Sequence, residues 1–214
     1  MAILIAHSCR RPSPCPAPSA TPGSGVRRES LLCQWRRIGW CVLLLLFAPS
    51  TLFAQSTREY QIKAAFLFNF AQFVLWPATV FTNNTQPFQI GVLGDNPFGK
   101  ALEETVRGET IQGRPIVIVQ SSHAEKLAGC QILFVNKSEA AHFGDVFSKL
   151  DSKPVLTVSE DPGFIQHGGV INFYRDGPKV RFELNPDAAE KNGLKLGSDL
   201  LSVGKIVHSE APTK

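Results

Sequence analysis

The sequence predicts a single α/β domain over residues 55–214, with a mainly parallel central sheet flanked by helices and a C-terminal β-hairpin. Two observations lead to this prediction. Short runs of residues that are apolar on both faces alternate with helical stretches over residues 88–158, which is typical of a parallel sheet covered by helices. Two strand-like segments over residues 170–184 then flank a turn that contains Gly and Pro, which predicts the hairpin.

Residues 1–54 are expected to be a leader and not part of this domain. Arg36 and Arg37 precede an apolar run, residues 38–48, and Ala54 follows as a small residue. This order is typical of a secretory signal peptide, so we expect cleavage near Ala54 and a periplasmic mature chain. An uncleaved anchor is the less favoured alternative, because the run is shorter than the roughly 20 residues of a spanning helix.

The leader is also longer than the roughly 15 to 30 residues that are usual for a signal peptide. Residues 9–25 are rich in Pro and Cys and resemble translated non-coding sequence. We therefore expect this part to be an N-terminal extension and the true translation start to lie near Val26 or Leu31. Residues 55–214 remain as the folded domain.

Charge and cysteine content are distributed unevenly between the leader and the domain. The domain carries 16 basic and 17 acidic side chains, and its net charge of about −1 lacks the basic excess of nucleic-acid-binding proteins. Nucleic acid is therefore not an expected partner. Four of the five cysteines lie in the leader, so Cys130 has no partner for an internal disulfide, and we expect it to be a buried small hydrophobic residue.

The first helix is predicted over residues 59–76. It is apolar nearly all round, and Pro77 ends it. A helix of this kind is normally buried on most sides. We expect a core helix; the alternative is that part of its face docks a partner, and the same phenylalanine-rich surface can support a homodimer.

The following elements alternate between strand and helix. Asn96 and Pro97 are expected to cap and open a helix that runs to Arg107. A second helix is predicted over residues 138–150. The four predicted strands are residues 88–93, 115–119, 131–135 and 155–158.

The hairpin is predicted from strands 170–174 and 180–184, with its turn at Asp176 and Gly177. Polar and apolar residues alternate in the second strand, so we expect one face of the hairpin to be polar and exposed. Asn185 and Pro186 then start a helix that Gly193 stops. Ser198 is expected to cap a last helix, whose apolar stripe comprises Leu200, Leu201, Val203, Ile206 and Val207.

The sequence offers no set of residues suited to catalysis. The glycines after the first strand lack the spacing of a dinucleotide or P-loop site, and no nucleophile elbow is present. The four histidines of the domain, His123, His142, His167 and His208, lack ligand spacing and are expected at the surface. We therefore predict a protein that is not an enzyme, with no catalytic, cofactor-binding or metal-binding residue and no cofactor. A hydrolase remains an outlying alternative, because Ser159, Glu160 and Asp161 cluster after a strand.

Several short motifs occur in an order that is fairly specific when taken together. They are Tyr60 to Phe70 with Trp76-Pro77, Gly91 to Gly99, Gly113-Arg114-Pro115, Cys130 to Phe134, Gly168-Gly169, Val180 to Asn185 and Gly193 to Leu196. In this order the chain resembles the YfiR family of periplasmic proteins, and the resemblance covers nearly all of the domain.

The resemblance implies a regulator. YfiR-like proteins repress a membrane-bound diguanylate cyclase by binding its periplasmic region, and so control cyclic-di-GMP and biofilm formation. An outer-membrane lipoprotein that sequesters the repressor is the second partner that the resemblance implies. By position, the resemblance also assigns Ile171 and Glu183 to partner binding. Well-studied members carry two disulfides, whereas only the Cys130 position is present here, which puts intramolecular redox control in doubt.

A second class of function shares the same predicted fold. Similar domains serve as sensory modules, so the alternative is a periplasmic small-ligand module that reports to a histidine kinase or a transporter. The sequence alone does not separate this alternative from the repressor.

Overall fold

In the computed structural model the described residues are 51–83, 85–151 and 153–208, with side chains described from Ser56 onward. They belong to one compact unit, Ser50–Lys214. The expected signal peptide and N-terminal extension lie outside the described residues, apart from residues 51–54 at the start of the first described helix. Within the described part, no helix is both long enough and apolar enough to cross a bilayer.

The unit is built on an eight-stranded sheet with the order β10-β8-β7-β6-β5-β2-β4-β3. The pairs β4–β2, β2–β5, β5–β6, β6–β7 and β8–β10 are parallel, whereas β7–β8 and β3–β4 are antiparallel. The predicted mainly parallel sheet and the hairpin are therefore confirmed, but the turn expected at Asp176 and Gly177 lies at Gly177 and Pro178, because Asp176 pairs with Lys179. The strands are β2 (Phe88–Leu93), β3 (Thr110–Ile111), β4 (Arg114–Ser121), β5 (Ile132–Val135), β6 (Leu156–Ser159), β7 (Ile171–Asp176), β8 (Lys179–Leu184) and β10 (Lys205–Ile206).

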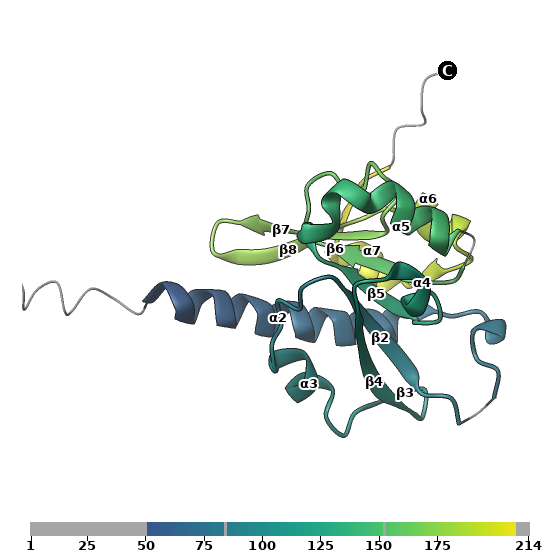
Figure 1. Ribbon diagram of the computed structural model, residues 1–214. Coiled ribbons are helices and arrows are strands. Elements are labelled where there is room, and N and C mark those ends of the chain that lie inside the picture. The colour runs from purple at the N-terminus through teal and green to yellow at the C-terminus, as the bar shows by residue number, and fades with distance from the viewer. Residues whose placement is uncertain (1–50, 84, 152, 209–214) are drawn as a thin grey trace, which may run out of the picture. The chain divides into compact units, whose positions relative to one another are not determined.

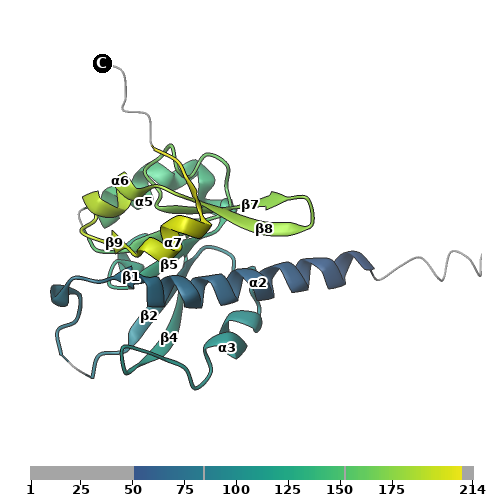
Figure 2. The ribbon, with the colours of Figure 1, turned by 180° about the vertical axis from the view of Figure 1, so that it is seen from behind.

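Helices cover both faces of the sheet, as Figures 1 and 2 show from opposite sides. One hydrophobic cluster joins α2 and α3 to one face, and a second joins α4 and α5 to the other. The helices are α2 (Thr51–Phe73), α3 (Ala101–Val106), α4 (Ala124–Leu127), α5 (Phe143–Leu150), α6 (Pro186–Lys191) and α7 (Ser198–Val203), with 3₁₀ turns η1 (Ala78–Val80) and η2 (Lys137–His142). This arrangement confirms the expectation that strands apolar on both faces are covered on both sides.

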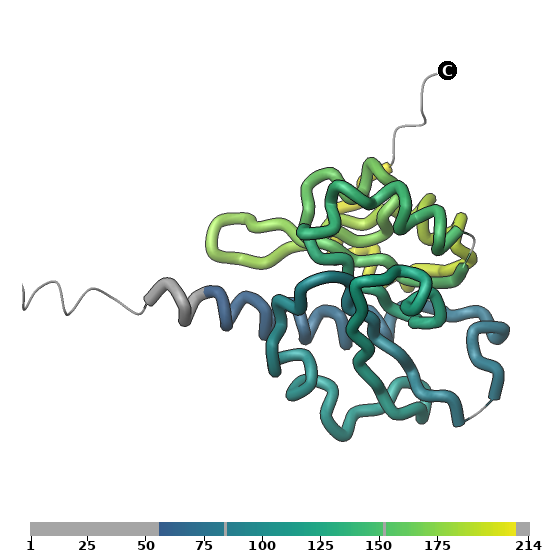
Figure 3. The backbone as a smooth tube through the Cα atoms, viewed as in Figure 1, coloured from purple at the N-terminus to yellow at the C-terminus, as the bar shows by residue number. Residues whose placement is uncertain are grey.

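The β7–β8 hairpin packs against α2 through aromatic rings. The ring centroid of Phe70 in α2 lies 5.8 Å from that of Phe173 and 5.0 Å from that of Phe182. The ring centroid of Phe66 lies 5.3 Å from that of Phe182. Ring pairs at these separations stabilise a contact beyond the area that they bury. The paired strands continue past the end of β6, and Figure 3 traces the hairpin projecting from the sheet along α2.

The first helix ends earlier than the sequence predicts. Instead of reaching Trp76, α2 stops at Phe73, and β1 (Val74–Leu75) pairs antiparallel with β9 (Lys195–Leu196). The backbone N–H of Gly197 donates to the carbonyl of Phe73 at 2.9 Å. A tertiary pairing thus overrides the local helical pattern at its C-terminal end.

Four further elements differ from the prediction. The helix expected to open at Pro97 begins only at Ala101, because Gly99 has a φ of 54°, outside the right-handed helical region, and residues 97–100 form a turn. The helix expected over residues 138–150 is a 3₁₀ turn followed by α5. The short elements β3 and α4 were not predicted at all.

The C-terminal helix is shorter than expected. Gly197, and not Ser198, is the N-cap of α7, and the helix ends at Val203. Ile206 lies in β10, and only Leu200 of the helix is buried. The expected apolar stripe is therefore wrong as a buried face, because Val203 and Ile206 are 70% and 48% exposed.

Candidate functional site

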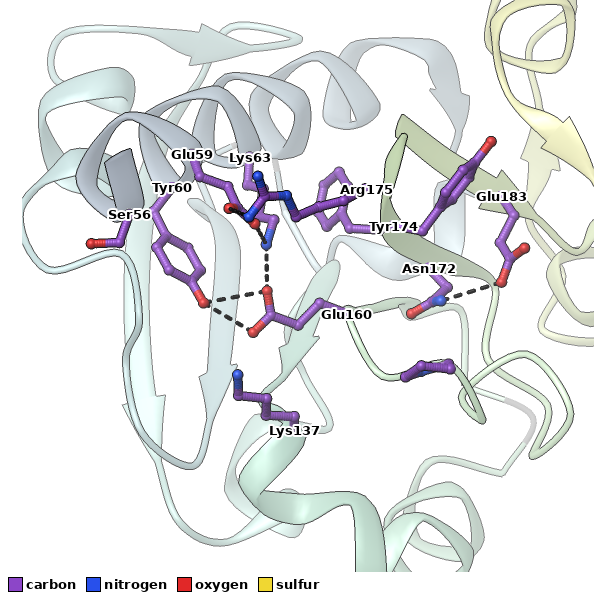
Figure 4. A pocket seen from close by; sticks show the side chains of 12 residues that line it. Ser56, Glu59, Tyr60, Lys63, Lys137, Glu160, Asn172, Tyr174, Arg175 and Glu183 are labelled. Carbon is purple, nitrogen blue, oxygen red and sulfur yellow. Dashed lines mark hydrogen bonds and ion pairs between the residues drawn. The ribbon is translucent and has the colours of Figure 1, made fainter. Parts of the chain in front are cut away.

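A pocket of about 660 Å³ opens where the hairpin separates from the rest of the sheet. β6 ends at Ser159 and pairs with β7 only at Ile171 and Asn172, so the outer part of β7 has no strand on that side among the described residues. The pocket lies between this part of β7, the first half of α2 and the segment that follows β6 (Figure 4). Lys137 of η2 also lines it, so its walls come from the hairpin and from three other segments that are distant in the sequence.

Lys63 is the central charge of this pocket. Its ammonium group lies 2.6 Å from Oε1 of Glu59, one helical turn earlier, and contacts Oε2 of Glu160. The side chain of Lys63 is only 4% exposed, and that of Glu160 is 9% exposed. A buried charge is tolerated only when it is paired and hydrogen-bonded, and this pairing ties α2 to the end of β6.

Two further side chains extend the network. The Tyr60 hydroxyl donates to Oε1 of Glu160 at 3.0 Å, and Arg175 from β7 places Nη1 3.6 Å from Oε2 of Glu59. Burial, followed by the negative charge of Glu160, raises the pKa of the Tyr60 hydroxyl above its usual range. The tyrosine therefore stays protonated at neutral pH and acts as a hydrogen-bond donor to the carboxylate.

Glu183 lies on the hairpin wall of the pocket. Its carboxylate accepts from Nδ2 of Asn172 at 3.2 Å and lies 3.9 Å from the ammonium group of Lys205. Its side chain is 16% exposed, so it reaches solvent from the pocket wall. The polar strand face expected from the alternation in β8 is thus present, although Glu183 is more buried than an open surface position.

Ile171, which the resemblance assigns to partner binding, lies in the core of the domain. Ile171 is fully buried and belongs to the hydrophobic cluster on the α2 side of the sheet. Like Asn172 after it, Ile171 pairs with both neighbouring strands, and it lies opposite Val158 and Leu184. A side chain enclosed in this way supports the hairpin and cannot contact a partner directly in this conformation.

The residues considered for hydrolysis do not converge on the pocket. Ser159 is buried and donates its hydroxyl hydrogen to the carbonyl of Val135 at 2.7 Å. Asp161 accepts from the backbone N–H of Gly163 at 2.8 Å, which stabilises the turn after β6. Only Glu160 of the three lines the pocket, and its oxygens are occupied by Lys63 and Tyr60.

The sequence analysis missed the ion-pair network. One signal was available, since Glu59 and Lys63 stand four residues apart in an otherwise apolar helix, the spacing at which helical side chains meet. Glu160 lies 97 residues further along the chain from Lys63, and Arg175 comes from the hairpin. No local pattern predicts those partners.

The structure also places the cysteine and the four histidines of the domain. Cys130 is 3% exposed, and burial raises the pKa of its thiol to about 11, so the expected buried cysteine is confirmed. The four histidines are exposed, as expected. Among the described residues, no three His, Cys, Asp or Glu side chains are grouped as metal ligands would be.

A second, smaller hollow of about 240 Å³ lies on the outer side of the hairpin. Phe66, Tyr174, Val180 and Val203 contribute apolar side chains to it. Ile62, one helical turn before Phe66, is 39% exposed, and Val203 is 70% exposed. Exposed large apolar side chains that gather in one place are typical of an interaction surface.

Three comparisons with known proteins bear on this chain. The model of the YfiR/HmsC-like family matches residues 60–205. A search of curated proteins gives no match. Among solved structures, a conserved domain protein from Vibrio cholerae O1 biovar El Tor strain N16961 is similar, with 10% identity and a TM-score of 0.45. That similarity covers 56% of this chain and 54% of the other, so the chain spans about half the length of that structure.

Proposed function

Because the chain belongs to the YfiR/HmsC-like family, we propose that it is an exported, non-catalytic regulator that binds and represses an inner-membrane diguanylate cyclase. The observation that supports this proposal is the extent of the family match. Residues 60–205 run from α2 to the first residue of β10 and include the other seven strands of the sheet, with the hairpin, in full. Control of cyclic-di-GMP and biofilm formation, and release by an outer-membrane lipoprotein, follow from the same membership as parts of the proposal.

The projecting hairpin and the adjoining face of α2 are the surface that we assign to the cyclase. Ile62 and the hollow lined by Phe66 and Val203 supply exposed apolar area. Glu183 supplies a carboxylate that lies 3.9 Å from the ammonium group of Lys205, which lines the same hollow. Apolar contacts with a polar rim are the usual composition of a protein interface. Ile171 acts indirectly in this proposal, because its burial fixes the position of the hairpin.

Repression follows from differential affinity. If the protein binds the inactive conformation of the cyclase more tightly than the active one, binding shifts the population toward the inactive form. The pocket network contributes by holding the hairpin against α2 through Arg175 and Glu59. A hairpin held in one position keeps the binding surface ready and lowers the entropic cost of association.

The test replaces Glu183 in a strain that lacks the chromosomal gene. Glu183→Arg is expected to raise cellular cyclic-di-GMP toward the level of the deletion strain, and to weaken capture of the cyclase from membranes. Glu190→Arg on α6, an exposed acidic position away from the hairpin, is the matched control and should repress normally. Periplasmic abundance is measured for each variant. Normal cyclic-di-GMP with Glu183→Arg at normal abundance would remove this surface from the proposal.

The pocket favours a second candidate function, a small-ligand sensory module. Its volume of about 660 Å³ lies within the range of small-molecule sites, and its walls carry both charge signs and two tyrosines. Native mass spectrometry of the protein purified from cells tests this function, because a retained ligand would add a discrete mass. Lys137→Ala, at the pocket wall, should then lose the adduct. If the protein carries no added mass and repression is intact, the sensory function is rejected and the regulator function remains.

A further inference from the structure

The pocket of about 660 Å³ between α2, the end of β6 and the hairpin contains one cation without a carboxylate partner. Lys63 and Arg175 pair with the carboxylates of Glu59 and Glu160. Lys137 lines the same pocket but occurs in none of the ion pairs between described residues. Figure 4 shows its side chain extending from η2 with the ammonium group directed into the pocket. This cluster therefore combines three cations with two carboxylates, an excess of one positive charge.

The remaining carboxylate of the pocket wall, that of Glu183, does not balance this charge. One of its oxygens accepts from Asn172 at 3.2 Å, and the other lies 3.9 Å from the ammonium group of Lys205. Figure 4 shows Glu183 and Lys137 on opposite sides of the pocket. A bound anion with a single charge beside Lys137 would complete the electrostatic balance.

Asn172 provides a second group without a partner. The residue is 2% exposed, and its Oδ1 accepts no hydrogen bond within the described part of the protein. The orientation of the amide is fixed, because the carboxylate of Glu183 only accepts and must therefore face Nδ2. Oδ1 is turned away from Glu183, toward the side of the pocket that holds Glu160 and Lys137 (Figure 4). A buried acceptor without a donor is costly, so a donor on a bound molecule would stabilise this wall.

We infer that the pocket binds a small hydroxylated monocarboxylate, the chemistry of a sugar acid; this inference rests on the sensory function proposed for the same pocket. The carboxylate of the ligand pairs with Lys137, and one of its hydroxyl groups donates to Oδ1 of Asn172. Hydrogen bonds between ionised groups are stronger than neutral ones. Lys137 therefore contributes most to affinity, whereas Asn172 selects ligands that carry a hydroxyl group.

Other classes of ligand fit the charges of the pocket less well. A cation would have to displace Lys63 from Glu59 and Glu160, and separating a largely buried ion pair is costly. A phosphate monoester carries roughly −1.5 to −2 charges at neutral pH, which exceeds the excess of one positive charge. An ammonium group on the ligand would add a positive charge, whereas a hydroxyl group donates to Asn172 and leaves the charge unchanged.

Isothermal titration calorimetry of the purified protein with three matched probes tests the ligand class. D-galacturonate has a six-membered ring, one carboxylate and several hydroxyl groups. D-galactose lacks the carboxylate, and cyclohexanecarboxylate lacks the hydroxyl groups. We expect D-galacturonate to bind about tenfold or more tightly than either comparison probe. Equal binding of one comparison probe, or tighter binding of a galactose phosphate ester, would overturn the class.

Two lysine variants test where the ligand binds. Lys137→Met should weaken the binding of D-galacturonate about tenfold or more, because it removes the cation that pairs with the carboxylate. Lys126→Met is the matched control, since Lys126 is an exposed lysine on α4 and does not line the pocket. Circular dichroism confirms that both variants are folded. Equal affinity of the two variants for D-galacturonate would overturn the role of Lys137.

Native mass spectrometry distinguishes failure of this inference from failure of the sensory function. A retained amine or phosphate ester would overturn the ligand class and leave the sensory function standing. A retained hydroxylated monocarboxylate would support both. Absence of any retained mass, together with no binding of the probes, would reject the sensory function and this inference with it.

Discussion

Replacement of Lys63 by Met gives the most direct test of the pocket network. Methionine keeps an unbranched apolar side chain of nearly the same reach, with sulfur in place of one methylene, and lacks the ammonium group. Glu160 would then lose the cation that contacts it, while its side chain remains 9% exposed. Glu59 would keep Arg175, whose guanidinium lies 3.6 Å away. The substitution therefore leaves one carboxylate, that of Glu160, poorly compensated.

The size of the effect follows from the burial of the two groups. Breaking a buried ion pair by removal of one partner costs about 3–5 kcal/mol. Because Glu160 retains the hydrogen bond from Tyr60 and some solvent contact, we expect the lower end, about 3 kcal/mol of unfolding free energy. For a domain of this size, 1 kcal/mol corresponds to a change in Tm of about 2–4 °C. The expected fall in Tm is therefore about 6–12 °C.

Thermal and urea unfolding, followed by circular dichroism, measure this loss. Lys149→Met is the control, since Lys149 and Glu125 form a pair 3.1 Å apart whose side chains are about half exposed. Exposed pairs contribute about 1 kcal/mol or less. In the double variant Lys63→Met/Glu160→Gln the unpaired charge is gone, so its loss should be smaller than the sum of the single losses. Equal losses for Lys63→Met and Lys149→Met would refute the reasoning.

Two further predictions concern buried positions. Cys130 should resist iodoacetamide at pH 8 until the protein unfolds, because its folded pKa is about 11. The unfolded thiol ionises near pH 8.5. Burial of the protonated thiol therefore contributes to stability below that pH, and this contribution is lost as the pH rises toward 11. Rapid alkylation of the native protein would contradict the burial of Cys130. Gly169→Ala should cost about 1–3 kcal/mol in urea unfolding, because a Cβ there would lie 2.2 Å from the buried ring of Phe164. Gly144→Ala, with no atom within 4 Å of the added Cβ, is its control and should not destabilise.

The sheet was predictable because its strands carry their signal locally. β2 matches its predicted limits, Phe88–Leu93, and β5, β6 and the hairpin agree with the prediction to within two residues at each end. Each is a short apolar run bounded by turn residues, so burial and local preference agree. The prediction of local structure failed where pairing with a distant segment determines the conformation. Val74 and Leu75 continue a helical pattern but pair with β9.

The site was less predictable than the fold, because its charged residues come from segments that are distant in the sequence. Lys63 and Glu59 are neighbours on one helix, whereas Glu160 and Arg175 reach them only after the chain has formed the sheet and the hairpin. The burial of Ile171 could not be predicted for a related reason. It depends on which face of the hairpin α2 covers, and α2 lies far away in the sequence.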